Sequence, residues 1–164
     1  MLRIRRLGIQ DQVMLWEWLH VSLWNPQPAR PRPREVLRDP AVRIYAENWG
    51  RPGDLGAVGE LDGEVAPIGA CWMRVLPAEV GLAYVDVETP QLGIALFSRF
   101  RQQGHGRRLM QAALEAARAA GRKQVALTVH PENPAIALYE SCGFEKAGLR
   151  NTYHLMIARL APVS

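Results

Sequence analysis

The chain has 164 residues, of which 48% are hydrophobic and 22% charged, and it carries a formal net charge of +4 at pH 7. This length and balance are typical of one globular domain, here residues 1–164, and they exclude a globally disordered chain or two full domains. The sequence has no run of about 18 uncharged apolar residues and no apolar signal segment near its start, so we expect a soluble, cytoplasmic protein. Two cysteines, Cys71 and Cys142, allow neither a disulfide framework nor a zinc pattern, so no metal site is expected.

The N-terminal quarter is predicted to form one strand followed by helices. Leucine and isoleucine alternate with arginine over residues 2–7, which is typical of a strand with one buried face. Apolar residues on more than one face predict a helix over 9–24, and closely spaced prolines predict an extended loop over 25–33. Short helices are expected over 33–38 and, with a proline at its first position, over 40–46.

Strands are predicted for the middle of the chain. Residues 55–61 and 65–76 flank Asp62-Gly63, a pair typical of type I′ turns, so they are expected to form an antiparallel hairpin. A short strand is expected over 83–87, and the apolar run 91–97 predicts a buried central strand.

Helices and strands alternate in the last part of the chain. An alanine-rich helix is predicted over 104–120, a buried strand over 125–129 and a second helix over 134–141. Two final strands are expected over 144–149 and 152–159.

This order of elements predicts a mixed α/β, or α+β, fold rather than a doubly wound array. The strand at 91–97, the helix at 104–120 and the strand at 125–129 form a unit whose crossover is right-handed, so the two strands are expected to be parallel. Ligands of such a unit bind beyond the carboxyl end of the strand, at the N-terminus of the helix. Residues 97–107 are therefore the predicted position of a binding site.

The segment between that strand and that helix reads Arg101-Gln102-Gln103-Gly104-His105-Gly106-Arg107-Arg108. Free backbone N–H groups, the positive end of the helix dipole and glycines that admit a ligand together make an anion site suited to polyphosphate. A Walker A loop is absent, and Arg108-Leu109 stand where a dinucleotide fingerprint needs its third glycine. No acidic residue occurs between Glu88 and Glu115, whereas several arginines do.

This Arg-x-x-Gly-x-Gly segment resembles the motif with which the GNAT (GCN5-related) N-acetyltransferase superfamily binds the pyrophosphate of acetyl-CoA. The segment 130–144, His-Pro-Glu-Asn-Pro-Ala-Ile-Ala-Leu-Tyr-Glu-Ser-Cys-Gly-Phe, is similar to the Asn…Ala…Leu-Tyr…Gly-Phe block of that family. Together with the strand 90–96, the resemblance covers residues 90–145. It implies a GNAT-like fold: a mostly antiparallel, twisted sheet of about seven strands with a splayed parallel fourth and fifth strand, flanked by about four helices.

The resemblance also implies a role for each motif residue. Main-chain groups of Leu96, Phe97 and Ser98 would hold the acetyl-pantetheine arm like an added strand. The loop that follows would hold the pyrophosphate, which assigns to cofactor binding Arg101, Gln102, Gln103, Gly104, His105, Gly106 and Arg107. Asn133 would contact the pantetheine region or cap the following helix. Tyr139 would lie near the thioester sulfur and act as the general acid that protonates the leaving thiolate, or would be a core aromatic.

The identity of the general base stays open at this point. Many family members have a glutamate at the start of the fourth strand, but this chain has Gln91, which cannot accept a proton. Glu88 is the candidate base, with a solvated loop carboxylate as the alternative interpretation of this residue. Asp86 and Glu132 are weaker candidates.

These patterns predict an acyltransferase that transfers the acetyl group of acetyl-CoA to a primary amine by direct attack in a ternary complex. The acceptor is expected to be a small-molecule or peptide amine, with no nucleic acid or membrane as a partner, and the protein to be a monomer or a homodimer. One alternative is a catalytically silent acyl-CoA sensor, which Gln91 favours. A second is transfer of a different acyl group, because the phosphate site does not distinguish acyl chains.

Overall fold

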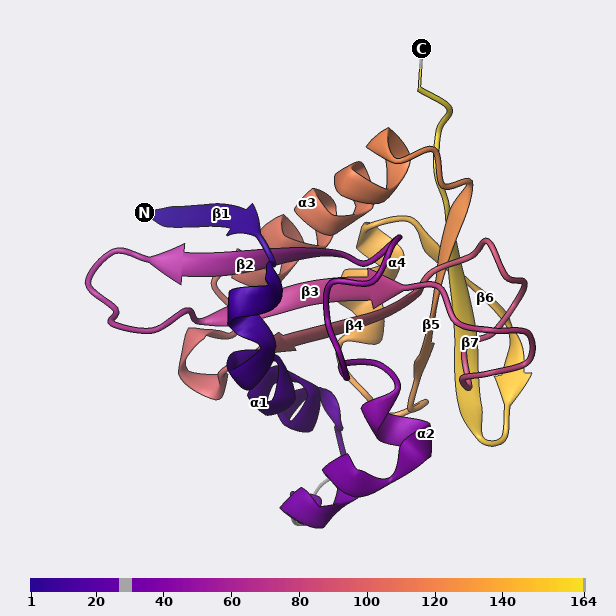
Figure 1. Cartoon of the computed structure of the whole chain (residues 1–164), viewed down its shortest axis with the longest axis horizontal. Coiled ribbons are helices and arrows are strands. Elements are labelled where there is room, and N and C mark those ends of the chain that lie inside the picture. The colour runs from indigo at the N-terminus through magenta and orange to yellow at the C-terminus, as the bar shows by residue number, and fades with distance from the viewer. Residues whose placement is uncertain (27–30, 164) are drawn as a thin grey trace.

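A seven-stranded sheet forms the centre of the computed structural model, which describes residues 1–26 and 31–163 (Figure 1). Its strands lie in the order β1-β2-β3-β4-β5-β7-β6. Neighbouring strands are antiparallel except β4 and β5, which are parallel as predicted. The strands are β1 Leu2–Arg6, β2 Leu55–Leu61, β3 Gly69–Arg74, β4 Gln91–Leu96, β5 Gln124–Val129, β6 Phe144–Arg150 and β7 Tyr153–Arg159.

Helices cover both faces of this sheet, which confirms the predicted mixed α and β architecture (Figure 1). The first two helices, α1 and α2, lie on one face, and α3 and α4 on the other. None of the described helices is long and apolar enough to cross a membrane. The α-helices are α1 Gln12–Ser22, α2 Pro40–Arg43, α3 His105–Ala119 and α4 Ile136–Ser141, and 3-10 turns cover Ile9–Asp11, Arg34–Arg38 and Ser98–Phe100.

The two hydrophobic cores follow from the alternation of side chains along the strands. In β3, Cys71 and Met73 pack into the core beneath α3, whereas Ala70 and Trp72 pack into the core beneath α1. Every residue of β3 is buried, because helices cover both faces of the sheet at this strand. The helices contribute Leu109, Met110, Ala113 and Ala117 from α3 and Leu15, Trp18 and Leu19 from α1.

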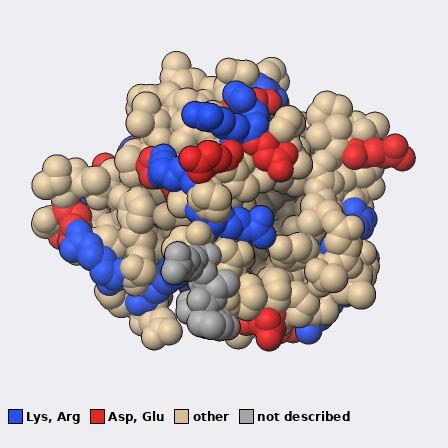
Figure 2. Space-filling view, turned by 90° about the horizontal axis from the view of Figure 1, so that it is seen from below, with Lys and Arg blue, Asp and Glu red and all other residues tan. Residues whose placement is uncertain are grey.

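The parallel strands β4 and β5 separate soon after they meet. Their pairing is limited to Gln91 with Ala126, whereas β4 pairs with β3 along its whole length. The facing edges of β4 and β5 beyond this point are therefore left without a neighbouring strand. The protein surface is hollowed near the middle of the view in Figure 2, with basic and acidic side chains around the hollow.

The strand predicted over 83–87 is wrong, because these residues form turns. Gly81 has a positive φ of 92°, and the Tyr84 N–H donates to its carbonyl oxygen at 3.1 Å. The Arg150 guanidinium then donates to the carbonyl oxygens of Leu82 and Tyr84, at 3.2 and 2.6 Å. A side chain from a distant strand thus satisfies backbone groups that a sheet neighbour would otherwise take.

The hairpin of β2 and β3 is confirmed, but its turn and its second strand differ from the prediction. Gly63 has a positive φ of 89° whereas Asp62 does not, so the turn is not type I′. The second strand begins at Gly69 rather than at residue 65, because Pro67 has no N–H to donate.

Helix boundaries show smaller differences from the sequence-based expectations. The segment expected to be helical over 33–38 is a 3-10 turn, α2 ends at Arg43 instead of Ala46, and α4 begins at Ile136 instead of Pro134. Residues 27–30 of the expected proline-rich loop lie outside the described residues.

Candidate active site

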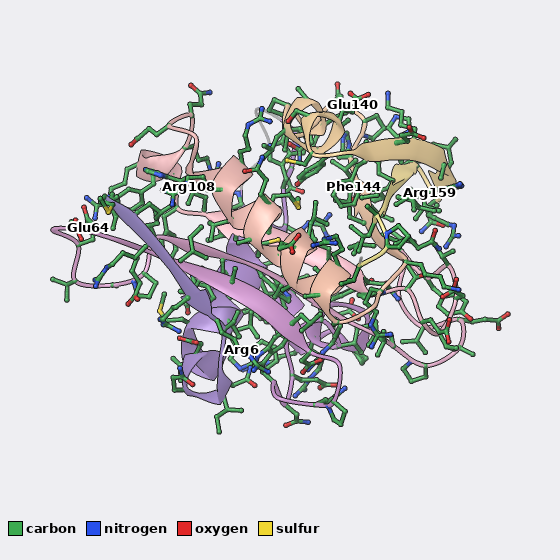
Figure 3. All side chains as sticks on the ribbon, turned by 90° about the horizontal axis from the view of Figure 1, so that it is seen from above. Arg6, Glu64, Arg108, Glu140, Phe144 and Arg159 are labelled. Carbon is green, nitrogen blue, oxygen red and sulfur yellow. The ribbon has the colours of Figure 1, made fainter. Side chains whose placement is uncertain are left out.

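The loop before α3 presents a row of unused backbone donors. Within the described part of the chain, the N–H groups of residues 102–107 donate no hydrogen bond, and the first helical bond of α3 runs from Arg108 to Gly104 at 3.3 Å. Gln102 and Gly104 have positive φ values of 61° and 85°. Figure 3 shows α3 lying across the sheet, with Arg108 in its first turns. Free N–H groups at the positive end of a helix dipole favour anions, so the loop has the donors that the predicted anion site requires.

Side chains of the same loop hold it against β4. The Arg101 guanidinium donates through Nε to the Leu96 carbonyl oxygen at 2.9 Å, and the Gln103 amide donates to the Arg99 carbonyl oxygen at 3.1 Å. These two predicted ligand residues therefore fix the loop through their side chains. The backbone N–H of Gln103 has no partner among the described residues, whereas that of Arg101 donates to the Ser98 carbonyl oxygen.

The end of β4 offers backbone groups on its open edge. The Phe97 N–H donates to the Ile68 carbonyl oxygen at 3.1 Å, on the side of β3. Backbone groups of successive strand residues point to opposite edges, so those of Leu96 point to the side from which β5 has separated. The Ser98 carbonyl oxygen accepts the Arg101 N–H at 3.2 Å. Leu96 thus has the orientation that an added extended segment requires, and its N–H is the available group.

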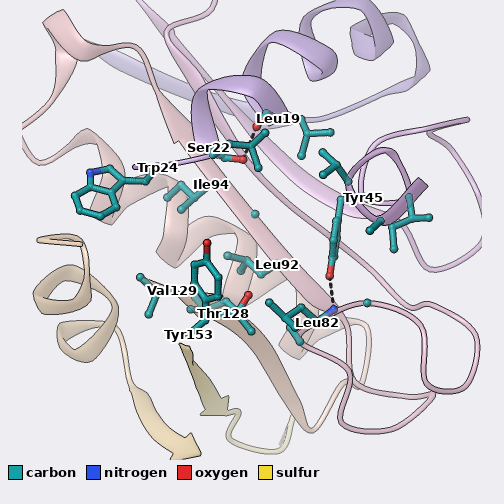
Figure 4. Close-up of a pocket in the computed structure, with 18 of the residues that line it drawn as sticks. Leu19, Ser22, Trp24, Tyr45, Leu82, Leu92, Ile94, Thr128, Val129 and Tyr153 are labelled. Carbon is teal, nitrogen blue, oxygen red and sulfur yellow. Dashed lines mark hydrogen bonds between the residues drawn. The ribbon is translucent and has the colours of Figure 1, made fainter. Parts of the chain in front are cut away.

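A cavity of about 790 Å³ lies where β4 and β5 diverge (Figure 4). Its walls come from the end of α1, the segment after it, α2, the loop 79–83, β4, the end of β5 and the start of β7. Tyr45 and Tyr153 approach it from opposite sides in Figure 4. The lining is mostly apolar, and it includes Tyr139 and Asn133 from the region of α4.

Tyr139 is buried, with 8% of its surface exposed, and it lines this cavity. Its ring packs edge-on against Phe144, with the centroids 6.2 Å apart. Burial raises the pKa of the Tyr139 hydroxyl, so this group keeps its proton at neutral pH. The described residues provide no hydrogen-bond partner for the hydroxyl. It is therefore a proton donor available to a molecule in the cavity.

Asn133 has the capping contact that the sequence allowed as an alternative. Its Oδ1 accepts the Ala135 N–H at 2.9 Å, which orders the turn before α4. The side-chain NH₂ group has no partner among the described residues, although Asn133 lines the cavity. The capping contact therefore leaves this donor available to a ligand.

The structure does not bring Glu88 together with Tyr139. Glu88 lies with Asp86 on the loop before β4 and lines a second cavity of about 430 Å³, beside the C-terminal end of α3. Glu132 is exposed and lines neither cavity. Among the described residues, the carboxylate that lines the larger cavity is Glu79, which has a positive φ of 63°. Its place on a loop distant from the motif gave no signal in the sequence.

Gln91 was expected only as a missing base, but it holds the wall of the cavity together. Its Oε1 accepts the Tyr45 hydroxyl at 2.8 Å, and its Nε2 donates to the Val80 carbonyl oxygen at 2.8 Å. The Tyr45 oxygen in turn accepts the Leu82 N–H at 3.1 Å. Gln91 is 1% exposed. Both ends of its amide are used, and a carboxylate could supply only the acceptor.

Comparisons with known proteins agree with these features. Residues 16–144 match the model of the acetyltransferase (GNAT) family. The chain is 36% identical over 147 residues to the mycothiol acetyltransferase of Beutenbergia cavernae, a match that covers 89% of this chain and 46% of that protein. The chain therefore spans about half the length of this curated relative.

Solved structures share the fold at low sequence identity. The ribosomal-protein-S18-alanine N-acetyltransferase of Escherichia coli superimposes with a TM-score of 0.68 at 20% identity, covering 100% of this chain and 97% of the other. The PaiA N-acetyltransferase of Thermoplasma acidophilum, in complex with coenzyme A, has the same TM-score at 16% identity, with coverage of 98% and 99%. Because the family model matches most of the chain, the chain belongs to the acetyltransferase (GNAT) family.

Proposed function

We propose that this protein transfers the acetyl group of acetyl-CoA to a primary amine. The observation that carries the proposal is the row of unpartnered N–H groups at residues 102–107, within the described chain, next to a strand end whose open edge leads into the cavity of Tyr139. The related structure of PaiA N-acetyltransferase contains coenzyme A. The loop fits a pyrophosphate, because its free donors are backbone groups and the space at Gly104 is open.

The residues that would hold the co-substrate divide between two types of contact. The N–H groups of residues 102–107 would bind the phosphates, and the open edge of β4 at Leu96 would bind the pantetheine arm as an added strand. Asn133 would contribute its free NH₂ group. Bound acetyl-CoA supplies an acyl group that an amine can attack, with a thiol as the leaving group.

Tyr139 is the general acid in this proposal. Its hydroxyl keeps its proton at neutral pH because burial raises its pKa, and no partner among the described residues competes with the leaving group. A thiol has an ordinary pKa near 8.5, so the departing thiolate accepts a proton readily, and donation from a positioned hydroxyl stabilises it as it leaves.

The amine must lose a proton before it attacks. A primary amine has a pKa near 10.4, so its neutral form costs roughly 4 to 5 kcal/mol at pH 7 without help from the site. Glu79 lines the larger cavity together with Tyr139, whereas Glu88 lines the second, smaller cavity. Glu79 therefore replaces Glu88 as the proposed proton acceptor, acting directly or through water.

The experiment measures thiol release from acetyl-CoA in the presence of primary amines. Tyr139→Phe is expected to lower turnover by about 10- to 1000-fold with acetyl-CoA affinity nearly unchanged. Tyr84→Phe is a matched control, since Tyr84 is a half-buried tyrosine outside both cavities. Equal turnover in Tyr139→Phe and the parent protein would remove Tyr139 from the mechanism.

The alternative of a silent acyl-CoA sensor predicts a different result. It predicts binding of acetyl-CoA without thiol release for any amine. Transfer of a longer acyl group predicts faster thiol release from the corresponding acyl-CoA than from acetyl-CoA.

A further inference from the structure

The large cavity contains few charged side chains. Among the described residues that line it, the arginine is Arg32, the carboxylate is Glu79, and most others are apolar or aromatic. Residues 27–30, which the structure does not describe, include no Asp or Glu in the sequence. The phosphate-binding N–H groups of residues 102–107 are not part of this lining. Arg32 therefore faces a different part of the site from the phosphates.

Several neutral groups hold Arg32 in place. Its Nε donates to the Asn25 Oδ1 at 3.2 Å, and its Nη2 donates to the Tyr153 hydroxyl at 3.3 Å. Its backbone carbonyl oxygen lies 2.7 Å from the His20 Nε2. These contacts come from α1, the segment after it and β7, so the guanidinium is fixed from different parts of the fold.

Arg32 has no carboxylate partner within the described part of the chain. By contrast, Arg34 on the neighbouring turn pairs with Glu17 at 2.6 Å. Arg32 is half-buried, and a partly desolvated guanidinium gains most from a bound anion. Its Nη1 is unused by the described residues, which leaves a donor for such an anion.

Aromatic rings form the wall beside Arg32. The His130 ring lies 5.3 Å from Trp24 and 5.8 Å from Tyr153, centroid to centroid. The His130 Nδ1 accepts the Glu132 N–H at 3.0 Å, which places the proton of the neutral ring on Nε2. This wall therefore offers flat, mostly uncharged surface to an acceptor with an apolar body.

We propose that the acceptor is an amine with an apolar or aromatic body that also carries a carboxylate, and that Arg32 binds this carboxylate. The inference rests on the proposed acetyl transfer. Glu79 is a single carboxylate, and Arg32 repels additional positive charge, so polycations fit this cavity poorly. The acceptor class thus differs from spermidine and aminoglycosides, which are named for other proteins of this fold.

The test compares acceptors that differ only in the carboxylate. Phenylalanine is paired with phenylalaninamide, and 4-(aminomethyl)benzoate is paired with benzylamine. The two acids differ in the distance between amine and carboxylate. Spermidine and kanamycin represent polycations. We expect kcat/KM to be about 10- to 100-fold higher for the acid of at least one pair than for its neutral partner. Arg32→Gln should remove this preference, whereas Arg34→Gln should keep it.

Calorimetric titration with N-acetylphenylalanine and 4-(acetamidomethyl)benzoate, in the presence of coenzyme A, gives a readout that needs no turnover. We expect at least one of these acids to bind the parent protein about 10- to 100-fold more tightly than it binds Arg32→Gln, with thermal melting showing that the variant is folded. Arg32-dependent binding without any turnover would contradict the proposed acetyl transfer but support the anion site. Equal kcat/KM for acids and neutral partners, a preference for spermidine, or acid binding that Arg32→Gln leaves unchanged would overturn the proposal.

Discussion

Replacing Gln91 by glutamate introduces the acidic residue that the family resemblance implies at the start of β4, yet the structure predicts a loss of stability. The Gln91 amide accepts the Tyr45 hydroxyl and donates to the Val80 carbonyl oxygen while 1% exposed. In the variant Gln91→Glu, an ionised carboxylate would keep the first contact and place a buried charge against the Val80 oxygen. Such a buried, unpaired group costs about 3 kcal/mol. For a chain of this size, that lowers Tm by about 6 to 12 °C.

The loss of stability in Gln91→Glu should depend on pH, because the introduced carboxyl titrates. When protonated, the carboxyl of the introduced glutamate can donate to the Val80 oxygen, as the Gln91 amide does. The native state therefore binds this proton more tightly than the unfolded state, which places the native pKa of the introduced carboxyl above its ordinary value. The stability of Gln91→Glu therefore falls as pH rises from the ordinary glutamate pKa, near 4.3, through the raised native pKa. Thermal melting at pH 5 and pH 8 measures this difference.

The matched control is Gln124→Glu, since Gln124 is less buried and donates to the Thr89 hydroxyl oxygen at 3.0 Å. Its melting temperature should change little between the two pH values relative to the parent protein. If Gln91→Glu melts like the parent at pH 8, the wall of the cavity does not depend on the Gln91 amide. If its turnover rises, a carboxylate at position 91 acts as a base, and the structural role proposed for the Gln91 amide is contradicted.

Three further predictions concern stability and binding. Asp54→Ala should lower the unfolding free energy by about 3 to 5 kcal/mol in calorimetric melting, because it leaves the buried Arg74 without its carboxylate partner at 2.6 Å. A loss below about 1 kcal/mol would contradict this. Gly104→Ala should weaken acetyl-CoA binding in a titration, because Gly104 has a positive φ and the Cβ of the alanine would enter the open space of the loop. Unchanged affinity would argue against this site. The hydrogen bonds from Arg5 lower the pKa of Asp11, so this contact stabilises the fold above the ordinary carboxyl pKa, and the stabilisation is lost as pH falls through the depressed native pKa. Asp11→Asn should therefore flatten the acid side of the plot of unfolding free energy against pH. Parallel plots for the variant and the parent protein would refute this prediction.

Local patterns in the sequence were enough to predict the strand, loop and helix that form the proposed phosphate site. The apolar run at β4, the glycines before α3 and the alanine-rich helix are contiguous, and each indicates its structure without help from distant residues. The strand predicted over 83–87 failed because the Arg150 side chain, far away in sequence, satisfies the backbone there. Local periodicity contains no information about such a contact.

The same limit applies to the walls of the cavity. Arg32, Glu79 and Gln91 come from separate segments and are brought to the cavity by the sheet and the helices around it. Glu88 was predicted from its closeness in sequence to β4, but the chain turns it toward the second cavity. Tyr139 was predicted from the resemblance of residues 130–144 to the family, and its burial beside the cavity agrees with the proposed role.

Amide hydrogen exchange of the loop before α3 tests the central claim most directly. The N–H groups of residues 102–107 have no acceptor within the described chain, so they should exchange quickly in the free protein. With acetyl-CoA at about 100 times its Kd, their exchange should slow by up to about 100-fold, while the hairpin turn at residues 61–64 stays unchanged. Unchanged exchange at residues 102–107 in millimolar acetyl-CoA would contradict the assignment of this loop as the phosphate site.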